Sequence, residues 1–126
     1  MGLFSSKPKS AFPWIHITTE AQLLEAWDNN SGNMRLFFKH STRCSISSMA
    51  LSRFEEKWEK DEKRCTVYFI DLIAYRSVSN LLEKISGVMH QSPQVIVAQS
   101  KEVMYSATHS EIDALFIQKL VSTEKA

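Results

Sequence analysis

Apolar side chains follow two spacings along this chain. Short runs of large apolar residues at 34–39 and 66–71 are typical of strands buried on both faces of a sheet. Between them, a helix from Cys44 to about Asp61 is predicted by apolar residues at every fourth position: Ile46, Ala50, Phe54 and Trp58. The centre of the chain therefore alternates strand, helix and strand.

The segment before the first central strand carries a helix start signal. Either Thr18 or Thr19 can cap a helix, and Gln22 follows Thr19 at the spacing of a capping box. This helix ends near residues 28–33, and its apolar stripe consists of Leu23, Leu24 and Trp27. A weak strand at residues 14–17 adds an edge to the sheet.

The last part of the chain predicts a helix, a hairpin and a final helix. A short helix lies around residues 78–85, and residues 94–99 and 102–108 form two strands joined by a tight turn. The final helix is predicted to begin at Ser110, with four side chains facing the core: Ile112, Leu115, Phe116 and Leu120. This order predicts an α/β fold, a three-layer α/β/α sandwich with a mixed central sheet.

Length and charge narrow the class of protein. The 126 residues, 44% of them apolar, suit one domain at residues 13–126 after a flexible amino-terminal extension of residues 1–12. Fifteen Lys and Arg against fourteen Asp and Glu leave a net charge of +1, so no nucleic acid partner is expected. We see no apolar stretch of membrane-spanning length and no secretory signal, and expect a cytoplasmic protein with no membrane partner.

Cys44 is the candidate nucleophile, because it lies where a central strand has ended and the next helix begins. Unpaired backbone N–H groups and the positive end of the helix dipole stabilise a thiolate there, and Arg43 adds positive charge. Open α/β sheets also place ligand sites at the carboxyl ends of their strands. The alternative is an inert cysteine buried as a small apolar residue. The polar neighbours HSTR and SISS favour a reactive thiol.

The hydroxyl groups near Cys44 suggest monothiol chemistry. Thr42 can cap the helix or orient the thiolate. Ser47 completes a Cys-x-x-Ser start and either hydrogen-bonds the sulfur or simply occupies the first turn. No disulfide can close within such a turn, so exchange proceeds through a mixed disulfide with another molecule.

Cys65 is about 25 Å away from Cys44 along the helix and is expected to be structural. Four scattered histidines and two distant cysteines predict no metal site.

Three blocks together resemble a known family: HSTRCSIS at residues 40–47, DLIAYRSVSNLLEKISGV at 71–88 and HQSPQVIV at 90–97. They are similar to the monothiol bacilliredoxins of the YtxJ type, within the thioredoxin superfamily, over about residues 14–120. The positions that match the pattern are Thr42, Cys44, Ile46, Ser47, Ser92 and Pro93.

This resemblance implies a monothiol thiol-disulfide oxidoreductase without a bound cofactor. Cys44 would remove bacillithiol, or a related low-molecular-weight thiol, from mixed disulfides on proteins. S-thiolated proteins and the small thiol are therefore the expected partners. The resemblance also implies a cis peptide bond at Pro93, where composition alone favours trans, and pairing of the Ser92 backbone with the substrate.

One position departs from the resemblance, and two other functions remain open. The family usually has proline directly after the cysteine, whereas this chain has Ser45, which fixes the first helical turn less firmly and adds a donor. Ser41-x-x-Cys44 has the spacing of a peroxidatic thiol. The same fold can also serve as a noncatalytic module that binds peptides or a partner protein.

Overall fold

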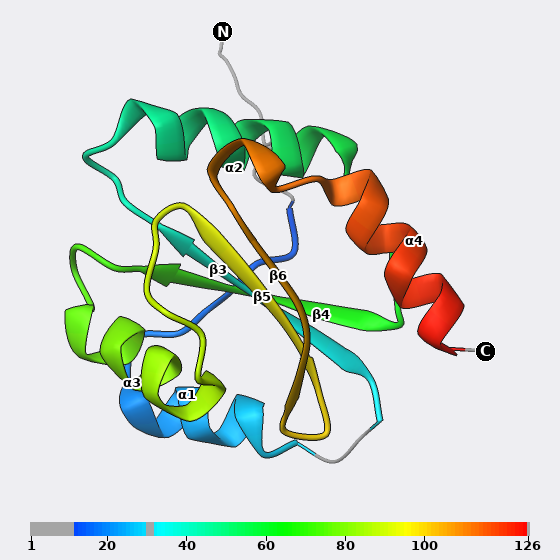
Figure 1. Ribbon diagram of the computed structural model, residues 1–126, viewed down its shortest axis with the longest axis horizontal. Coiled ribbons are helices and arrows are strands. Elements are labelled where there is room, and N and C mark those ends of the chain that lie inside the picture. Colours follow the sequence, from blue (N-terminus) through cyan, green and yellow to red (C-terminus); the bar gives the residue numbers. More distant parts are fainter. Residues whose placement is uncertain (1–11, 30–31, 126) are drawn as a thin grey trace, which may run out of the picture.

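The computed structural model describes residues 12–29 and 32–125, and its elements follow the predicted order (Figure 1). Thr19 caps the first helix and closes a capping box with Gln22, as predicted. The elements are β2 (Ile15–His16), α1 (Glu20–Trp27), β3 (Met34–His40), α2 (Ser45–Lys57), β4 (Cys65–Asp71), α3 (Arg76–Ser86), β5 (Gln94–Gln99), β6 (Glu102–Thr108), the 3-10 helix η2 (His109–Glu111) and α4 (Ala114–Lys125).

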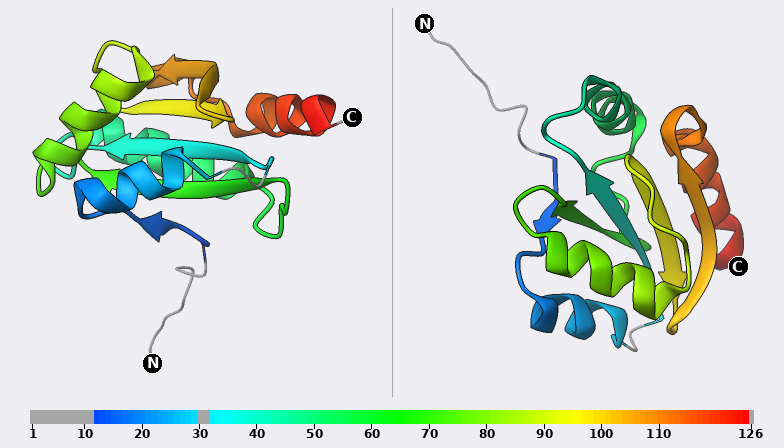
Figure 2. Two further views of the ribbon diagram at one scale, coloured as in Figure 1. Left: turned by 90° about the horizontal axis from the view of Figure 1, so that it is seen from below. Right: turned by 60° about the vertical axis from the view of Figure 1, so that its left-hand side comes forward.

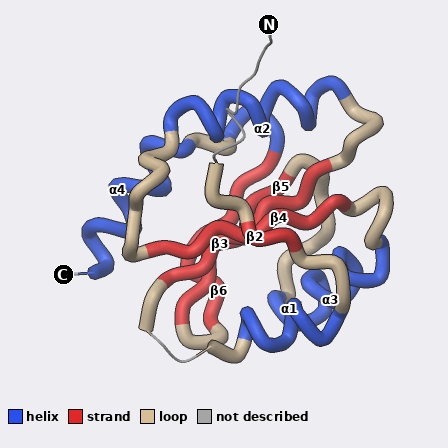
Figure 3. Tube along the Cα trace, turned by 180° about the vertical axis from the view of Figure 1, so that it is seen from behind, coloured by secondary structure: helices blue, strands red, loops and turns tan. Residues whose placement is uncertain are grey.

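The strands of the described residues form one mixed sheet in the order β2-β4-β3-β5-β6. β3 pairs in parallel with β4 and antiparallel with β5, and β5 and β6 form the predicted hairpin. Helices α2 and α4 lie on one face of the sheet, and α1 and α3 lie on the other (Figures 1 and 2). Figure 3 shows the helices on either side of the strands from behind. The predicted three-layer sandwich is confirmed.

β3 lies at the centre of this sheet, and all its side chains are buried. Leu36 and Phe38 join the core beneath α2 and α4, whereas Phe37 joins the core beneath α1 and α3. Successive side chains of a strand point to opposite faces, so a continuous apolar run supplies both cores at once. The prediction of a strand buried on both faces is confirmed.

Helix α4 starts later than predicted, and this changes the face that it buries. The 3-10 turn η2 comes first, and the Asp113 carboxylate then accepts a hydrogen bond from the Phe116 N–H at 3.2 Å as α4 begins. The inward positions of α4 are therefore Ala114, Ile117 and Val121. Ile112 is buried as predicted, but Leu115 and Phe116 are exposed, so their predicted inward orientation was wrong.

Helix α2 ends at Lys57 instead of near Asp61, with Trp58 buried just beyond its last turn. Ala50 faces the core as predicted, together with Phe54, but Ile46 is 56% exposed, so its predicted orientation was wrong. A spacing of four residues drifts around a helix of 3.6 residues per turn. The inward position of the first turn is taken by Ser47, which is fully buried.

Phe12, the first described residue, packs into the core. Phe12, which the sequence assigned to the flexible extension, is buried, and its ring lies 4.7 Å from that of Trp14 and 6.1 Å from that of Phe54 between centroids. Trp14 donates its indole N–H to Glu55 of α2 at 2.7 Å. Phe12 thus belongs to the core. The rest of the predicted extension, residues 1–11, lies outside the described residues.

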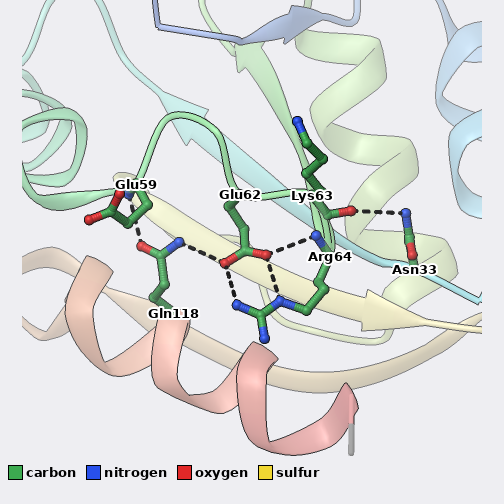
Figure 4. Close-up of polar contacts among 6 residues, drawn as sticks. All are labelled: Asn33, Glu59, Glu62, Lys63, Arg64 and Gln118. Atoms are coloured by element: carbon green, nitrogen blue, oxygen red, sulfur yellow. Dashed lines mark hydrogen bonds and ion pairs between the residues drawn. The ribbon is translucent and has the colours of Figure 1, made fainter.

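A polar network ties the loop between α2 and β4 to α4 (Figure 4). The Glu62 carboxylate accepts hydrogen bonds from the backbone and guanidinium of Arg64 at 2.8–3.0 Å and from the Gln118 amide of α4 at 3.0 Å. The Gln118 oxygen accepts from the Glu59 N–H at 2.9 Å. The hydrogen bonds from Arg64 lower the pKa of Glu62 to about 2, with a smaller contribution from Gln118.

Candidate active site

The loops at one edge of the sheet bring the predicted site residues together. β3 and β4 run in parallel and end side by side at His40 and Asp71. β5 runs in the opposite direction and begins at Gln94, beside the end of β3. The loops that follow β3 and β4 and the loop that precedes β5 therefore share one edge, on the left in Figure 1. Open α/β sheets place ligand sites at such an edge.

Cys44 is the N-cap residue of α2 at this edge. Its backbone is extended, with φ −121° and ψ 121°. Its N–H donates to the Ser41 carbonyl at 3.2 Å, and its carbonyl accepts from the Ser48 N–H at 3.1 Å. The thiol is free, and the residue is half-buried. A thiolate at this position meets the first-turn N–H groups of α2, which favour a negative charge.

Ser47 lies beneath this turn, and its hydroxyl has two partners. The Oγ accepts a hydrogen bond from the Ser41 N–H at 3.0 Å. The same atom lies 2.7 Å from Nδ1 of His40, the last residue of β3. Ser47 thus joins the first turn of α2 to the end of β3. Its predicted hydrogen bond to the Cys44 sulfur stays a prediction.

His40 is itself buried, on the face of β3 that α2 covers. Its ring centroid lies 5.6 Å from that of Phe69 in β4. Burial lowers the pKa of His40, although the charges of Asp71 and Glu55 oppose this effect. The imidazole is therefore held mainly neutral at physiological pH.

Thr42 and Arg43 form an exposed turn between β3 and α2. Thr42 does not cap the helix, because the N-cap residue is Cys44, which makes no side-chain capping bond. The capping prediction was wrong because the Ser41–Cys44 turn places Thr42 before the helix. That Thr42 and Arg43 stabilise the thiolate stays a prediction.

Ser92 and Pro93 lie where the loop after α3 enters β5, and the peptide bond between them is cis. Pro93 is buried, and its carbonyl accepts from the His109 N–H at 3.1 Å. Ser92 is half-buried, and its Oγ is shielded from solvent without a hydrogen-bond partner. This segment shares its sheet edge with Cys44. The pairing of Ser92 with a substrate stays a prediction.

The sequence analysis missed a buried lysine on the other face of β3. Lys39 is fully buried, and its Nζ lies 3.0 Å from Nδ1 of His90 in the loop that leads to Ser92. Glu83 of α3 accepts a hydrogen bond from the His90 N–H at 2.9 Å. Burial lowers the pKa of Lys39 to about 8, against the opposing charge of Glu83. The sequence placed Lys39 at the end of the doubly buried strand 34–39, but lysine is rarely fully buried, so its burial and its partner were not singled out.

Cys65 lies at the opposite end of the sheet, where it begins β4 and pairs with Met34. It is a free cysteine, and burial raises the pKa of its thiol to about 12, with a smaller contribution from Glu62. A strand of this length separates the two sheet ends by roughly 20 Å. Cys65 is therefore beyond disulfide reach of Cys44, in agreement with its predicted structural role.

Comparison with known proteins agrees with this geometry. Residues 15–117 match the family of monothiol bacilliredoxin BrxC. The chain belongs to this bacilliredoxin family. Family and fold together assign it to the thioredoxin-like redox proteins, which act on thiols and disulfides in general.

Solved structures similar to this bacilliredoxin share its fold at low sequence identity. One is described as an oxidoreductase candidate with a thioredoxin fold, with a TM-score of 0.71 and 22% identity over 85% of this chain and 94% of that chain. The thioredoxin of Trypanosoma brucei brucei has a TM-score of 0.69 and 11% identity over 96% and 100%. The thioredoxin of Schistosoma mansoni has a TM-score of 0.66 and 9% sequence identity, and the match covers 90% of this chain and 96% of that chain. These likenesses establish a thioredoxin fold.

Among residues 12–29 and 32–125, no three His, Cys, Asp or Glu side chains lie together as metal ligands would. In the same part of the chain, no helix has the length and apolar character needed to cross a membrane.

His40 is a second residue near this edge that the sequence analysis did not single out. Its position in the strand indicates where it points, because residues two apart on a strand face the same side and His40 therefore shares a face with Leu36 and Phe38. This face is covered by α2, and Ser47 is the inward residue of the first turn of that helix.

Proposed function

We propose that this bacilliredoxin removes bacillithiol, or a related small thiol, from mixed disulfides on proteins with Cys44 as the nucleophile. The observation that carries this proposal is the position of Cys44, a free and half-buried thiol at the amino end of α2. Ser47 occupies the position where a second cysteine could close a disulfide, and Cys65 is buried at the far end of the sheet. Resolution therefore depends on a second molecule.

The reaction consists of two thiol-disulfide exchanges. The Cys44 thiolate attacks the small-thiol sulfur of the mixed disulfide, the old S–S bond breaks, and the protein leaves as a thiolate. Cys44 then carries the small thiol in a new disulfide. The thiolate of a second small thiol attacks that disulfide, restores the Cys44 thiolate and leaves as the symmetrical small-molecule disulfide. Each step exchanges one disulfide bond for another, so the electrons balance with thiols and disulfides alone.

Exposed apolar side chains on α2 and on the loop that leads into β5 support a protein substrate. Ile46 and Met49 on the first turns of α2 are 56% and 60% exposed, and Met89 in the loop before Ser92 is 73% exposed. Apolar and methionine-rich surfaces suit binding of varied protein partners. We place this reaction in the cytoplasm, where small thiols are kept reduced.

The test measures release of protein thiol from a bacillithiolated substrate, with a glutathionylated substrate in parallel. We expect the wild-type protein to release thiol from the bacillithiolated substrate and to gain an adduct on Cys44 of the corresponding mass. Cys44→Ala should abolish both signals, whereas Cys65→Ala should retain them. Full activity of Cys44→Ala would contradict the proposal.

The same assay separates the other two functions. A peroxidatic enzyme would consume hydrogen peroxide far faster than free cysteine does and would release no thiol from either substrate. A noncatalytic module would bind the thiolated protein without forming an adduct on Cys44.

A further inference from the structure

We propose that His40 is a positioning residue that holds Cys44 at the amino end of α2 through the Ser47 hydroxyl. The inference rests on the proposed role of Cys44 as nucleophile. His40 and Ser47 belong to different elements, the end of β3 and the first turn of α2, and their side-chain atoms meet at 2.7 Å. Both residues are buried, with exposed fractions of 5% and 0%.

A chain of three hydrogen bonds connects the imidazole to Cys44. Nδ1 of His40 meets Ser47 Oγ, Ser47 Oγ accepts from the Ser41 N–H at 3.0 Å, and the Ser41 carbonyl accepts from the Cys44 N–H at 3.2 Å. Ser41 and Cys44 are the two ends of the turn that carries the thiol to α2. The hydroxyl therefore fixes the start of this turn, and the imidazole fixes the hydroxyl.

The imidazole can serve as this anchor in either neutral tautomer. With the proton on Nε2, Nδ1 accepts the Ser47 hydroxyl proton, and with the proton on Nδ1 it donates to Ser47 Oγ. In both cases Ser47 Oγ keeps its bond from the Ser41 N–H. The groups facing His40 are Asp71 from β4 and Glu55 from α2, together with the ring of Phe69.

The predicted consequence is a loss of Cys44 reactivity without loss of the fold. A thiolate gains from a helix amino terminus only within the first turn, so a loosened Ser41–Cys44 turn reduces that gain. His40→Phe keeps an aromatic ring beside Phe69 but lacks a polar atom for Ser47. His40→Asn instead offers a polar side-chain atom close to the position of Nδ1.

The experiment follows alkylation of Cys44 by iodoacetamide across pH 5 to 9, read by peptide mass, for His40→Phe, Ser47→Ala, the double variant and His40→Asn. We expect each of the first two to slow alkylation at pH 7 by roughly threefold to tenfold and to move the pH profile upward. The double variant should be no slower than either single variant, and His40→Asn should restore most of the rate. Ser79→Ala, which removes a buried α3 hydroxyl without a partner, should leave the rate unchanged.

Three results would overturn the proposal: a wild-type profile for Ser47→Ala, single effects that multiply in the double variant, or equal slowing by Ser79→Ala. If His40→Phe fails to fold by circular dichroism, the Ser47→Ala and His40→Asn profiles still decide. Alkylation needs no thiolated substrate, so a negative result here is distinct from failure of the proposed dethiolation. Failure of the proposed dethiolation by Cys44 would appear instead as thiol release that survives Cys44→Ala.

Discussion

The two cysteines of this chain differ in chemistry because they occupy opposite ends of one sheet. Cys44 follows the end of β3 and meets the unpaired N–H groups of α2. Cys65 begins β4 inside the core, where burial raises the pKa of its thiol to about 12. The same side chain is thus suited to nucleophilic attack at one end and to packing at the other.

Ser45, the residue directly after Cys44, offers a test of how firmly the first turn of α2 is held. Ser45 is the first residue of α2 and is exposed, and Cys44 before it has the extended backbone that a following proline requires. We expect Ser45→Pro to raise the free energy of unfolding by about 0.4–1 kcal/mol, measured by urea denaturation.

A matched control for that substitution is Ser48→Pro. The Ser48 N–H donates to the Cys44 carbonyl at 3.1 Å, so proline there removes the first hydrogen bond of α2. It should destabilise the protein by about 3 kcal/mol. Destabilisation by Ser45→Pro comparable to that of Ser48→Pro would show that the first turn of α2 does not have the geometry described.

Among the secondary-structure elements, α4 depends on a loop far from the candidate site. Its residue Gln118 binds both Glu62 and the Glu59 backbone, which fixes the segment between α2 and β4 (Figure 4). The Glu62 side chain is only 5% exposed, whereas that of Arg64 is 42% exposed. Much of the interaction is therefore screened on the arginine side.

Glu62→Gln tests this network through pH. The folded-state pKa of Glu62, about 2, lies below its ordinary value of 4.5, so the stabilisation is complete above pH 4.5 and is lost as pH falls toward 2. We expect the variant to lose about 1 kcal/mol of unfolding free energy at pH 7 and almost nothing near pH 2, measured by urea denaturation.

Glu59→Gln is the control for that variant, because Glu59 contributes its backbone N–H to the network. It should unfold at the wild-type urea concentration at each pH. A Glu62→Gln deficit that persists unchanged to pH 2 would show that the carboxylate charge is not the source of stability.

At the scale of the whole molecule, Lys39 links β3 to the loop that leads into β5. Its folded-state pKa, about 8, lies below its ordinary value of 10.5. Between these pH values the unfolded chain binds a proton that the folded protein lacks. Stability therefore rises with pH across this window, by at most about 1.4 kcal/mol per pH unit from this group.

Lys39→Met should remove this contribution. We expect the difference in unfolding free energy, wild type minus variant, to grow between pH 8 and 10.5, a window that lies above the lowered pKa of the neighbouring His90. Lys101→Met makes the same change of charge at an exposed lysine and should show no such window. If the difference in unfolding free energy for Lys39→Met stayed constant from pH 8 to 10.5, the lowered pKa of the buried Lys39 amine would be contradicted.

The sequence by itself determined the order of elements, the two central strands and the placement of Cys44 at a helix start. These rest on local signals: the apolar run of β3, the capping box at Thr19 and the change from strand to helical spacing at Cys44. Resemblance to the bacilliredoxins added the cis bond before Pro93, which composition did not favour.

Only the tertiary structure decided the side chains that meet across elements. Four features depend on how the helices lie against the sheet: which face of α4 is buried, the core position of Phe12, the burial of Lys39 and the contact of His40 with Ser47. Local spacing fixes which residues share a face of one element. It does not fix which residue of another element that face meets, because such contacts depend on the packing of the whole chain.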